Sequence, residues 1–290
     1  MSDSLQRFLF ENMPVRGHVV QLDATWRAVL DRHEYPEPLR GILGELMAAG
    51  ALLSATLKFD GSLVMQMQGS GIVKLIVVEV TSEATLRATA SWEGDVPDQP
   101  LRELLGTGRF VITLVPKESG TQSYQGVVEL NGDSVAGVLE HYMSTSEQLD
   151  SRLWLACDGR QAAGLLLQKV PGDHETLEDD WNRLSMLGDT LKPAELLRLP
   201  AREILRRLFH EDDVRVFEAS PVSFRCSCSR ERVTGMLRAL GHDEVRSIVR
   251  DHGAVDVTCE FCRKRYAFDA VDAEQIFAAD VQTRAEPTRH

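Results

Sequence analysis

Hydrophobic residues in the first half of the chain recur with two different periods, and each period predicts a type of element. Positions 25–32 and 38–57 carry apolar residues at helical spacing, and Pro38 suits the first turn of the second helix. Positions 62–68 alternate between apolar and polar residues, which predicts a half-buried strand. Positions 72–80 are nearly all apolar, which favours a strand buried on both sides.

The same pattern continues to about position 172. A polar turn containing Gly120 separates two apolar segments and indicates a hairpin. Positions 134–142 are typical of a helix in which Ser134 is the N-cap. We therefore expect residues 1–172 to form an α+β domain rich in antiparallel strands. Its later strands are predicted at 86–92, 110–115, 124–130, 152–156 and 164–170.

The segment 173–220 has a different character. Pro171-Gly172-Asp173 ends the strand pattern, and Pro193 and Pro200 each fit the start of a new helix. Amphipathic helices must bury their apolar face, and the N-terminal sheet is the surface we expect them to cover. They form either an ordinary helical layer or a detachable lid. Their apolar positions begin with Leu177, Trp181, Leu184, Leu187 and Leu191, and continue with Ile204, Leu205, Leu208 and Phe209.

The final segment, 221–290, predicts a small module with a frayed tail from 280 to 290. Ser229 can cap a helix that ends at Gly241, and a second helix follows at 243–250. Positions 254–258 and 266–268 are strand-like. A module of this size buries little core and needs an additional staple, for which a metal ion is the obvious choice.

Composition narrows the classes of function. The chain has 290 residues, a formal net charge of -12 and a pI of about 5.2. Acidic proteins are repelled by phosphate backbones and by anionic membranes. We read no signal peptide at the N-terminus, and the apolar run at 46–57 is too short to span a bilayer. We therefore expect a cytoplasmic protein, in which grouped cysteines are metal ligands or redox sensors rather than structural disulfides.

Four cysteines carry the clearest chemistry in the chain. Cys226 and Cys228 form a C-x-C pair, and Cys259 and Cys262 form a C-x-x-C pair. Four thiolates gathered in this way can close a tetrahedral zinc site. C-x-C is shorter than the usual ligand spacing, so its two sulfurs can chelate a metal or, after oxidation, bond to each other. The site can therefore have two states.

The free energies contributed by zinc and by disulfides predict what oxidation does to this module. Structural zinc contributes roughly 10–16 kcal/mol to folding a small site. A disulfide closing a loop of three or four residues contributes only about 1.5–2 kcal/mol. Two such disulfides do not replace the metal, so oxidation with loss of zinc should unfold the module. Six cationic residues lie close to the cysteines in the sequence: Arg225, Arg230, Arg232, Arg263, Lys264 and Arg265. They would favour the reactive thiolate form of the cysteines, or they are simply solvated surface charges.

Other reactive residues are less informative. Cys157 stands apart from both pairs in a predicted strand and is interpreted as a buried small hydrophobic residue. Three histidines could replace a cysteine ligand, but four cysteines already complete the set. The sequence contains no Gly-rich phosphate loop, no G-x-S-x-G elbow and no H-E-x-x-H motif. The histidines near the module are His210, His242 and His252.

The chain also resembles the bacterial heat shock protein 33 family, the redox-regulated 33-kDa chaperonins. Both cysteine pairs match the signature of that family, and Tyr266 follows the second pair as the pattern requires. The resemblance runs over nearly the whole length. The matching segments are 7–12, 35–38, 55–61, 124–128, 146–149, 199–201, 208–211, 224–232 and 259–262.

The resemblance implies an ATP-independent holdase and not an enzyme. In the family, the four cysteines hold zinc in the reduced, inactive state. Oxidation would form disulfides Cys226–Cys228 and Cys259–Cys262, release zinc, unfold the 173–220 linker and produce an active homodimer. Its partners would be unfolding proteins under oxidative and heat stress, which it would hand over to ATP-dependent foldase chaperones. Cys157 lies outside the family motif.

Two other classes remain open at this stage. A zinc-ribbon protein with constitutive structural zinc would bind a nucleic acid or a protein partner. The local net charge of 221–270, only +2, gives a weak nucleic-acid footprint. A thiol oxidoreductase using Cys259 and Cys262 would place its C-x-x-C at a helix N-terminus, whereas this pair lies between two strand-like runs.

Overall fold

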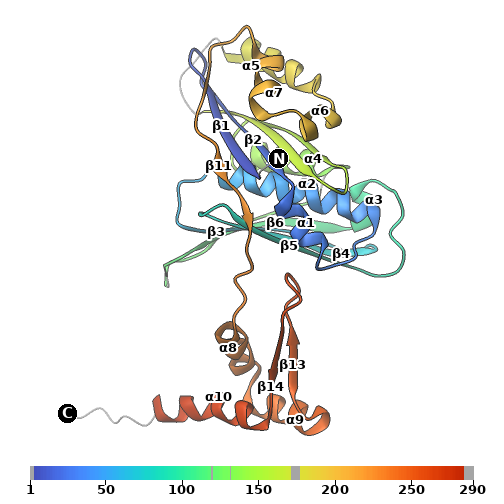
Figure 1. Cartoon of the computed structure of the whole chain (residues 1–290), viewed down its shortest axis with the longest axis vertical. Helices are drawn as coiled ribbons and strands as arrows, with labels where there is room; N and C mark the ends of the chain where they lie inside the picture. Colours follow the sequence, from blue (N-terminus) through green and yellow to red (C-terminus); the bar gives the residue numbers. More distant parts are fainter. Residues whose placement is uncertain (1–2, 119, 131, 171–176, 284–290) are drawn as a thin grey trace, which may run out of the picture. The chain divides into compact units, whose positions relative to one another are not determined.

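The chain divides into two compact units, Met1–Arg225 and Cys226–His290, and each is described by itself. The computed structural model describes residues 3–118, 120–130, 132–170 and 177–283 (Figure 1). The predicted break at Pro171-Gly172-Asp173 lies outside the described residues. The three-part division at 172 and 220 stays a prediction, and in the structure the helices after it belong to the first unit.

Two antiparallel-rich sheets form the first unit, and the described residues give each of them six strands. The first has the order β10-β1-β2-β9-β8, with β11 also paired to β1; the second has the order β12-β5-β4-β3-β6-β7. Only the β12–β5 pairing is parallel among those described. The first sheet contains β1 (Ser4–Phe10), β2 (Val15–Leu22), β8 (Ser151–Cys157), β9 (Ala162–Lys169), β10 (Val214–Val216) and β11 (Ser220–Pro221). The second contains β3 (Gly61–Gly69), β4 (Val73–Thr81), β5 (Thr85–Trp92), β6 (Gly108–Pro116), β7 (Tyr124–Glu129) and β12 (Ser223–Phe224).

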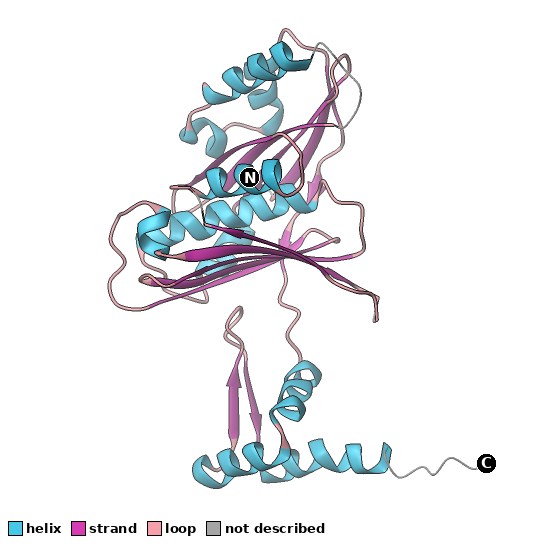
Figure 2. Cartoon of the chain, turned by 180° about the vertical axis from the view of Figure 1, so that it is seen from behind, coloured by secondary structure: helices cyan, strands magenta, loops and turns pink. Residues whose placement is uncertain are grey.

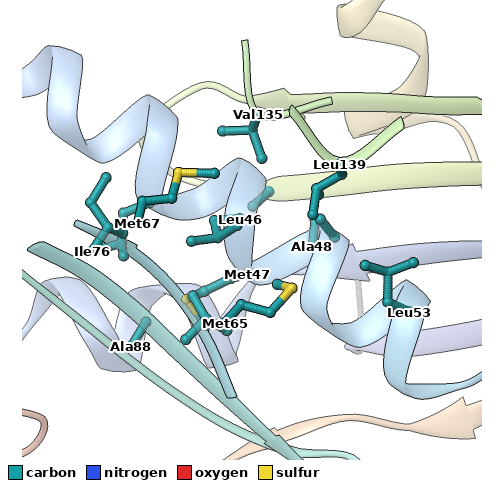
Figure 3. Close-up of a cluster of buried hydrophobic side chains, with 14 of the residues drawn as sticks. Leu46, Met47, Ala48, Leu53, Met65, Met67, Ile76, Ala88, Val135 and Leu139 are labelled. Carbon is teal, nitrogen blue, oxygen red and sulfur yellow. The ribbon is translucent and has the colours of Figure 1, made fainter. Parts of the chain in front are cut away.

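The long helix α2 (Glu37–Ser54) lies between the two sheets (Figure 1). Its buried side chains, among them Leu46 and Met47, pack with Met65 and Ile76 of the second sheet (Figure 3). Because both of its faces meet a sheet, burial explains the apolar run from 46 to 53; the rest of the predicted run, to 57, is less buried, and Leu57, beyond the end of the helix, is 37% exposed. Among the described residues, no helix is long and apolar enough to cross a membrane. Shorter helices complete this layer: α1 (Ala24–Leu30), α3 (Leu101–Leu105) and α4 (Val135–Thr145).

Three helices cover the other face of the first sheet, as the amphipathic pattern predicts (Figure 2). Trp181, Ile204 and Phe209 form one buried cluster with Phe10 and Leu165 of the sheet. Pro193 is the first residue of its helix and Pro200 is an N-cap, so both predicted helix starts are confirmed. The helices are α5 (Leu177–Asp189), α6 (Pro193–Arg198) and α7 (Ala201–Phe209).

Most predicted elements of this unit are confirmed, including the hairpin β6–β7 and the cap at Ser134, whose side chain accepts from the backbone N–H of Gly137. One prediction about burial is wrong. In β4 the face bearing Ile76 and Val78 is fully buried, while Leu75 and Glu79 on the other face are only partly buried. The reason is that antiparallel sheets can face solvent on one side. Strands β1, β2, β10, β11 and β12 and helix α3 have no counterpart in the sequence prediction.

The second unit is a small helical module around a hairpin. Ser229 caps its first helix, as expected, and Gly253 ends the second in the left-handed conformation, at φ 82°. Its core is small and includes Leu237, Val245 and Phe268. The last helix reaches Thr283, so positions 280–283 of the predicted frayed tail are helical and the remainder lies outside the described residues. The elements are α8 (Arg230–Leu240), α9 (His242–His252), β13 (Val255–Thr258), β14 (Arg265–Phe268) and α10 (Ala270–Thr283).

Candidate metal centre

Two short backbone segments bring the four predicted cysteines together in the second unit. Cys226 and Cys228 lie just before α8, whose first turn is capped by Ser229. Cys259 and Cys262 lie in the turn that joins β13 to β14. The C-x-x-C pair therefore lies in a β-hairpin and not at the start of a helix, which argues against a thioredoxin-like redox site.

Backbone hydrogen bonds fix the shape of the hairpin turn. The N–H of Cys259 donates to the carbonyl of Lys264 at 3.0 Å, and the N–H of Arg263 donates to the carbonyl of Cys259 at 2.8 Å. Arg263 has φ 61°, in the left-handed region that non-glycine residues rarely adopt. The tight turn thus holds Cys259 and Cys262 on a constrained backbone.

The four sulfurs have the spacing of a tetrahedral site. Sγ of Cys226 lies 3.7 Å from Sγ of Cys259, and Sγ of Cys228 lies 3.4 Å from Sγ of Cys262. All four ligand atoms lie within 4.8 Å of one another. Zinc–sulfur bonds of about 2.3 Å place the corners of a tetrahedron about 3.8 Å apart. The cluster can therefore hold a metal ion, and a set of four thiolates is typical of zinc or iron.

A tyrosine hydroxyl contributes to the electrostatics of the cluster. Burial by itself would raise the pKa of Cys228, but hydrogen bonds outweigh it and lower that pKa to about 7. The first of these comes from the hydroxyl of Tyr266, 3.1 Å from Sγ of Cys228, followed by those from Cys262, Cys226 and Cys259. Burial raises the pKa of Cys262 to about 12 and also raises the pKa of Cys259. All four side chains are half-buried, so a small oxidant can reach them.

Comparisons with known proteins now identify the family. A family model described as Hsp33 protein matches residues 3–269. The chain is 52% identical over 289 residues to the 33 kDa chaperonin of Chromobacterium violaceum, covering 99% of this chain and 98% of the relative. This chain belongs to the heat shock protein 33 family. It is also 49% identical over 292 residues to the 33 kDa chaperonin of Methylobacillus flagellatus, covering 100% of this chain and 99% of that relative.

The solved structures extend the similarity to the fold. A crystal structure of the 33 kDa chaperonin from Thermotoga maritima matches with a TM-score of 0.83 at 20% sequence identity. The match covers 97% of this chain and 100% of that structure. The fold of the heat shock protein 33 family is thus retained at low sequence identity.

In this member of the heat shock protein 33 family, the cations beside the cysteines have partners of their own. Arg230 forms an ion pair with Asp272 at 2.8 Å and lies over the ring of Phe268. Arg232 donates to the hydroxyl of Ser227 at 2.7 Å. The lowered pKa of Cys228 owes its largest favourable contribution to the hydroxyl of Tyr266, whereas sequence reasoning looked to the cations. Other ion pairs are Arg263–Glu260 at 3.6 Å and Arg265–Asp256 at 3.2 Å.

Cys157 and the histidines lie apart from the four-cysteine cluster. Cys157 belongs to β8 in the first unit, where it is partly buried and packs against the core. Its thiol lies 3.6 Å from the carbonyl of Arg40, and burial raises its pKa to about 12. The ring of His242 lies tilted against that of Phe277, with ring centroids 4.6 Å apart, and its Nε2 lies 3.4 Å from a carboxylate oxygen of Glu274. The metal-ligand cluster found in the described residues contains the four predicted cysteines and no histidine.

Sequence reasoning did not assign a role to Tyr266. The signal was available, because position 266 lies on the strand that returns from the C-x-x-C turn. A side chain there is close to the cysteines, and its aromatic ring is also part of the small core of the unit. Only the structure shows that its hydroxyl meets Cys228.

Proposed function

We propose that this chain is a redox-regulated, ATP-independent molecular chaperone that holds unfolding proteins and catalyses no reaction. The observation that carries the proposal is the gathering of Cys226, Cys228, Cys259 and Cys262 within 4.8 Å in a half-buried site. Relatives over the full length are named 33 kDa chaperonin, which supports a chaperone. We place its action in the cytoplasm, where reducing conditions keep thiols free until an oxidant arrives.

In the reduced state the four cysteines would act as zinc ligands. Zinc, when bound, would keep all four sulfurs as thiolates and add its binding energy to the stability of the unit. The unit needs that contribution, because its core contains few large buried side chains beyond Leu237, Tyr266 and Phe268 among its described residues. The redox role and the zinc role are thus assigned to the same four residues.

Oxidation would convert the ligands into disulfides Cys226–Cys228 and Cys259–Cys262. Each disulfide forms when one thiolate is oxidised by hydrogen peroxide to a sulfenic acid and its partner thiol displaces water. Four thiolates, two peroxide molecules and four protons give two disulfides and four water molecules. Disulfide sulfur is a poor ligand, so the metal ion is released. The half-buried position of the thiols gives a small oxidant access.

Loss of the metal would then propagate to the rest of the chain. We propose that the C-terminal domain, 221–290, unfolds and that the linker, 173–220, leaves the first sheet. The apolar face under α5 and α7, which includes Phe8, Phe10 and Leu165, would become exposed. The core domain, 1–172, would then dimerise, bind unfolding clients and pass them to ATP-dependent foldase chaperones. Large exposed apolar patches of this kind mark interaction sites.

Other functions receive less support. A zinc-ribbon protein that binds a nucleic acid is disfavoured by the net charge of -12 and by family membership. A thiol oxidoreductase is disfavoured by the position of Cys259 and Cys262 in a hairpin turn.

One paired experiment tests the proposal. Zinc content and suppression of client aggregation are measured before and after mild peroxide treatment at elevated temperature, and again after a thiol reductant. We expect zinc release and holdase activity to appear together and to be reversed by reduction. Mass-spectrometric mapping identifies the disulfides, and cross-pairs such as Cys226–Cys259 would contradict the proposed pairing. Retained zinc with no gain of activity would leave a purely structural zinc site.

A further inference from the structure

One continuous segment covers an edge of both sheets in the first unit. Residues 213–225, here called the strap, follow the linker helices and end one residue before Cys226. In the strap, β10 and β11 pair with β1, and β12 pairs with β5. In the strand order of the described residues, β1 and β5 would otherwise be the terminal strands of their sheets. The strap thus hides one edge of each sheet that could otherwise pair with another chain, while β8 and β7 are the terminal strands at the opposite ends.

The β1 edge is covered by direct backbone hydrogen bonds. The carbonyl of Arg7 accepts from the N–H of Phe217 at 3.0 Å, and the N–H of Glu11 donates to the carbonyl of Asp213 at 2.9 Å. Backbone groups of successive residues in a strand point to opposite sides. Odd-numbered residues of β1 therefore direct their backbone groups to the strap, while even-numbered residues direct theirs to β2.

The β5 edge is covered in the same way. The carbonyl of Ala84, just before the strand, accepts from the N–H of Ser223 at 3.2 Å, and the carbonyl of Leu86 accepts from the N–H of Arg225 at 3.0 Å. The two edges differ in direction, since the strap is antiparallel to β1 and parallel to β5. One extended segment therefore pairs with both edges. The pairing requires an extended backbone but not a particular strand direction.

Side-chain packing of the strap is mostly partial. Val214 and Val216 pack against the cluster on the first sheet, and Phe224 packs against the core between the sheets. Of the strap residues, all of which the structure describes, only Val222 is buried, with 6% of its surface exposed. An ion pair between Arg215 and Glu11 at 2.8 Å adds to these contacts, and the strap is also tethered at its two ends by helix α7 and by the cysteine cluster. If both of these unfold, the strap becomes a chain with free ends, and the entropic cost of keeping it on the sheets increases.

A cavity lies beneath the strap. It has a volume of about 460 Å³, within the range of sites that hold small molecules or side chains. Its walls are largely apolar, and its lining also includes one residue of each charge, Arg7 and Glu83. This cavity is already partly open to solvent, and removal of the strap would widen it beside the uncovered edges. Its apolar lining includes Leu5, Val80 and Leu86 from the sheets and Pro221 and Val222 from the strap.

We infer that the edges of β1 and β5, once the strap leaves them, bind an extended, aliphatic-rich segment of an unfolding polypeptide as an added strand. The strap itself is the example of what fits: an extended segment with valines at 214, 216 and 222. Backbone hydrogen bonds give such binding its affinity, and a pocket for alternate side chains gives it preference. This inference rests on the proposed chaperone function and adds a second binding surface to the apolar face of the first sheet.

Residue-resolved hydrogen exchange tests the inference on the full-length protein. The probe is reduced, carboxymethylated α-lactalbumin, a permanently unfolded chain without free thiols. We expect the amides of Leu5, Arg7 and Leu9 to lose protection after peroxide activation and to regain it when the probe is bound. The amides of Gln6 and Phe8, which face β2, are the internal control and stay protected throughout. Odd-numbered amides that remain protected after activation, or exposed with the probe bound, would overturn the inference.

A peptide competition gives an independent measurement. A synthetic peptide of residues 212–225 should compete with the probe for the activated protein. N-methylation at Arg215 and Phe217, whose backbone groups face β1, should reduce that competition several-fold. N-methylation at Val214 and Val216, whose backbone groups face away, is the matched control and should leave it unchanged. Equal behaviour of the two methylated peptides would contradict strand addition.

The two proposals fail in different ways. If peroxide-treated protein suppresses no aggregation, the chaperone function and this inference both fall. The treated protein could instead suppress aggregation while its odd-numbered β1 amides do not respond as expected and the two methylated peptides compete equally. In that case only strand addition is wrong, and binding through the apolar face stands.

Discussion

The hydroxyl of Tyr266 lies 3.1 Å from Sγ of Cys228 and donates a hydrogen bond to it. Groups that hydrogen-bond to metal ligands orient them and tune the metal. Tyr266→Phe removes the donor and keeps the ring, which is part of the small core of the unit. We expect zinc affinity to fall by about 10-fold, because second-layer contacts typically contribute that much or more. Competition with a chromophoric chelator measures it.

Comparison of Tyr266→Ala with Tyr266→Phe separates the contribution of the ring from that of the hydroxyl. Since the ring is 5% exposed, we expect Tyr266→Ala to lose thermal stability in the cysteine unit as well as zinc affinity. Equal zinc affinity in the wild-type protein and in Tyr266→Phe would show that the hydrogen bond does not matter to the metal.

Cys262→Ser should remove one of the four ligands. Its Sγ lies 3.4 Å from that of Cys228, so the variant leaves a three-thiolate site. We expect weaker zinc binding, increased protease sensitivity after residue 225 and holdase activity without oxidant. Metal analysis, limited proteolysis and a client-aggregation assay without oxidant check these three effects in turn.

The matched control for this variant is Cys157→Ser, since Cys157 belongs to the first unit. It should keep full zinc content and wild-type protease sensitivity of the C-terminal unit. A Cys262→Ser protein that binds zinc as tightly as the wild type would exclude Cys262 as a ligand.

Trp181→Ala should loosen the linker helices. Trp181 is 8% exposed and belongs to the cluster between α5, α7 and the first sheet. Loss of a buried tryptophan typically costs about 3–5 kcal/mol. We expect faster hydrogen exchange in α5 to α7 and activation at a lower oxidant dose. Met186→Ala is the control on the same helix, because Met186 is 69% exposed; similar exchange in both variants would refute the packing role of Trp181.

Glu45→Gln should change how the stability of the first unit depends on pH. Burial raises the pKa of the Glu45 carboxyl to about 7. Because the folded protein binds this proton more tightly than the unfolded chain does, the free energy of unfolding falls as pH rises from about 4.5 to about 7. The variant lacks this loss, which at about 1.4 kcal/mol per pH unit amounts to at most about 3 kcal/mol.

Urea unfolding followed by tryptophan fluorescence measures this effect, since all four tryptophans belong to the first unit. We expect Glu45→Gln to gain stability over the wild type at pH 8 but not at pH 4. Glu37→Gln, at an exposed position of the same helix, should follow the wild type at both values. Parallel pH profiles for Glu45→Gln and the wild type would contradict the assignment.

Local signals made several elements predictable. Ser134 and Ser229 cap helices because a hydroxyl satisfies the free backbone N–H groups of a first turn, and such chemistry depends on a few adjacent residues. Spacing likewise indicated that Cys226, Cys228, Cys259 and Cys262 meet, since zinc ligands have a narrow range of separations. The family resemblance added the redox roles of these residues, which spacing does not contain.

The strap strands could not be predicted in this way. β11 and β12 are two residues long, and they exist because residues far away in sequence, Leu5 and Leu86, offer free backbone groups. A segment of two residues has no period to read. Its conformation is decided by the sheets it meets rather than by its own composition.

The sequence alone thus determined the fold class, the helical layer over the first sheet and the identity of the four clustered cysteines, because each is written in periodicity or spacing. Tertiary structure decided which hydroxyl meets Cys228, which face of β4 is open to solvent and that one segment covers β1 and β5 together. These depend on contacts between distant residues, which form only when the whole unit packs, and no local pattern encodes them.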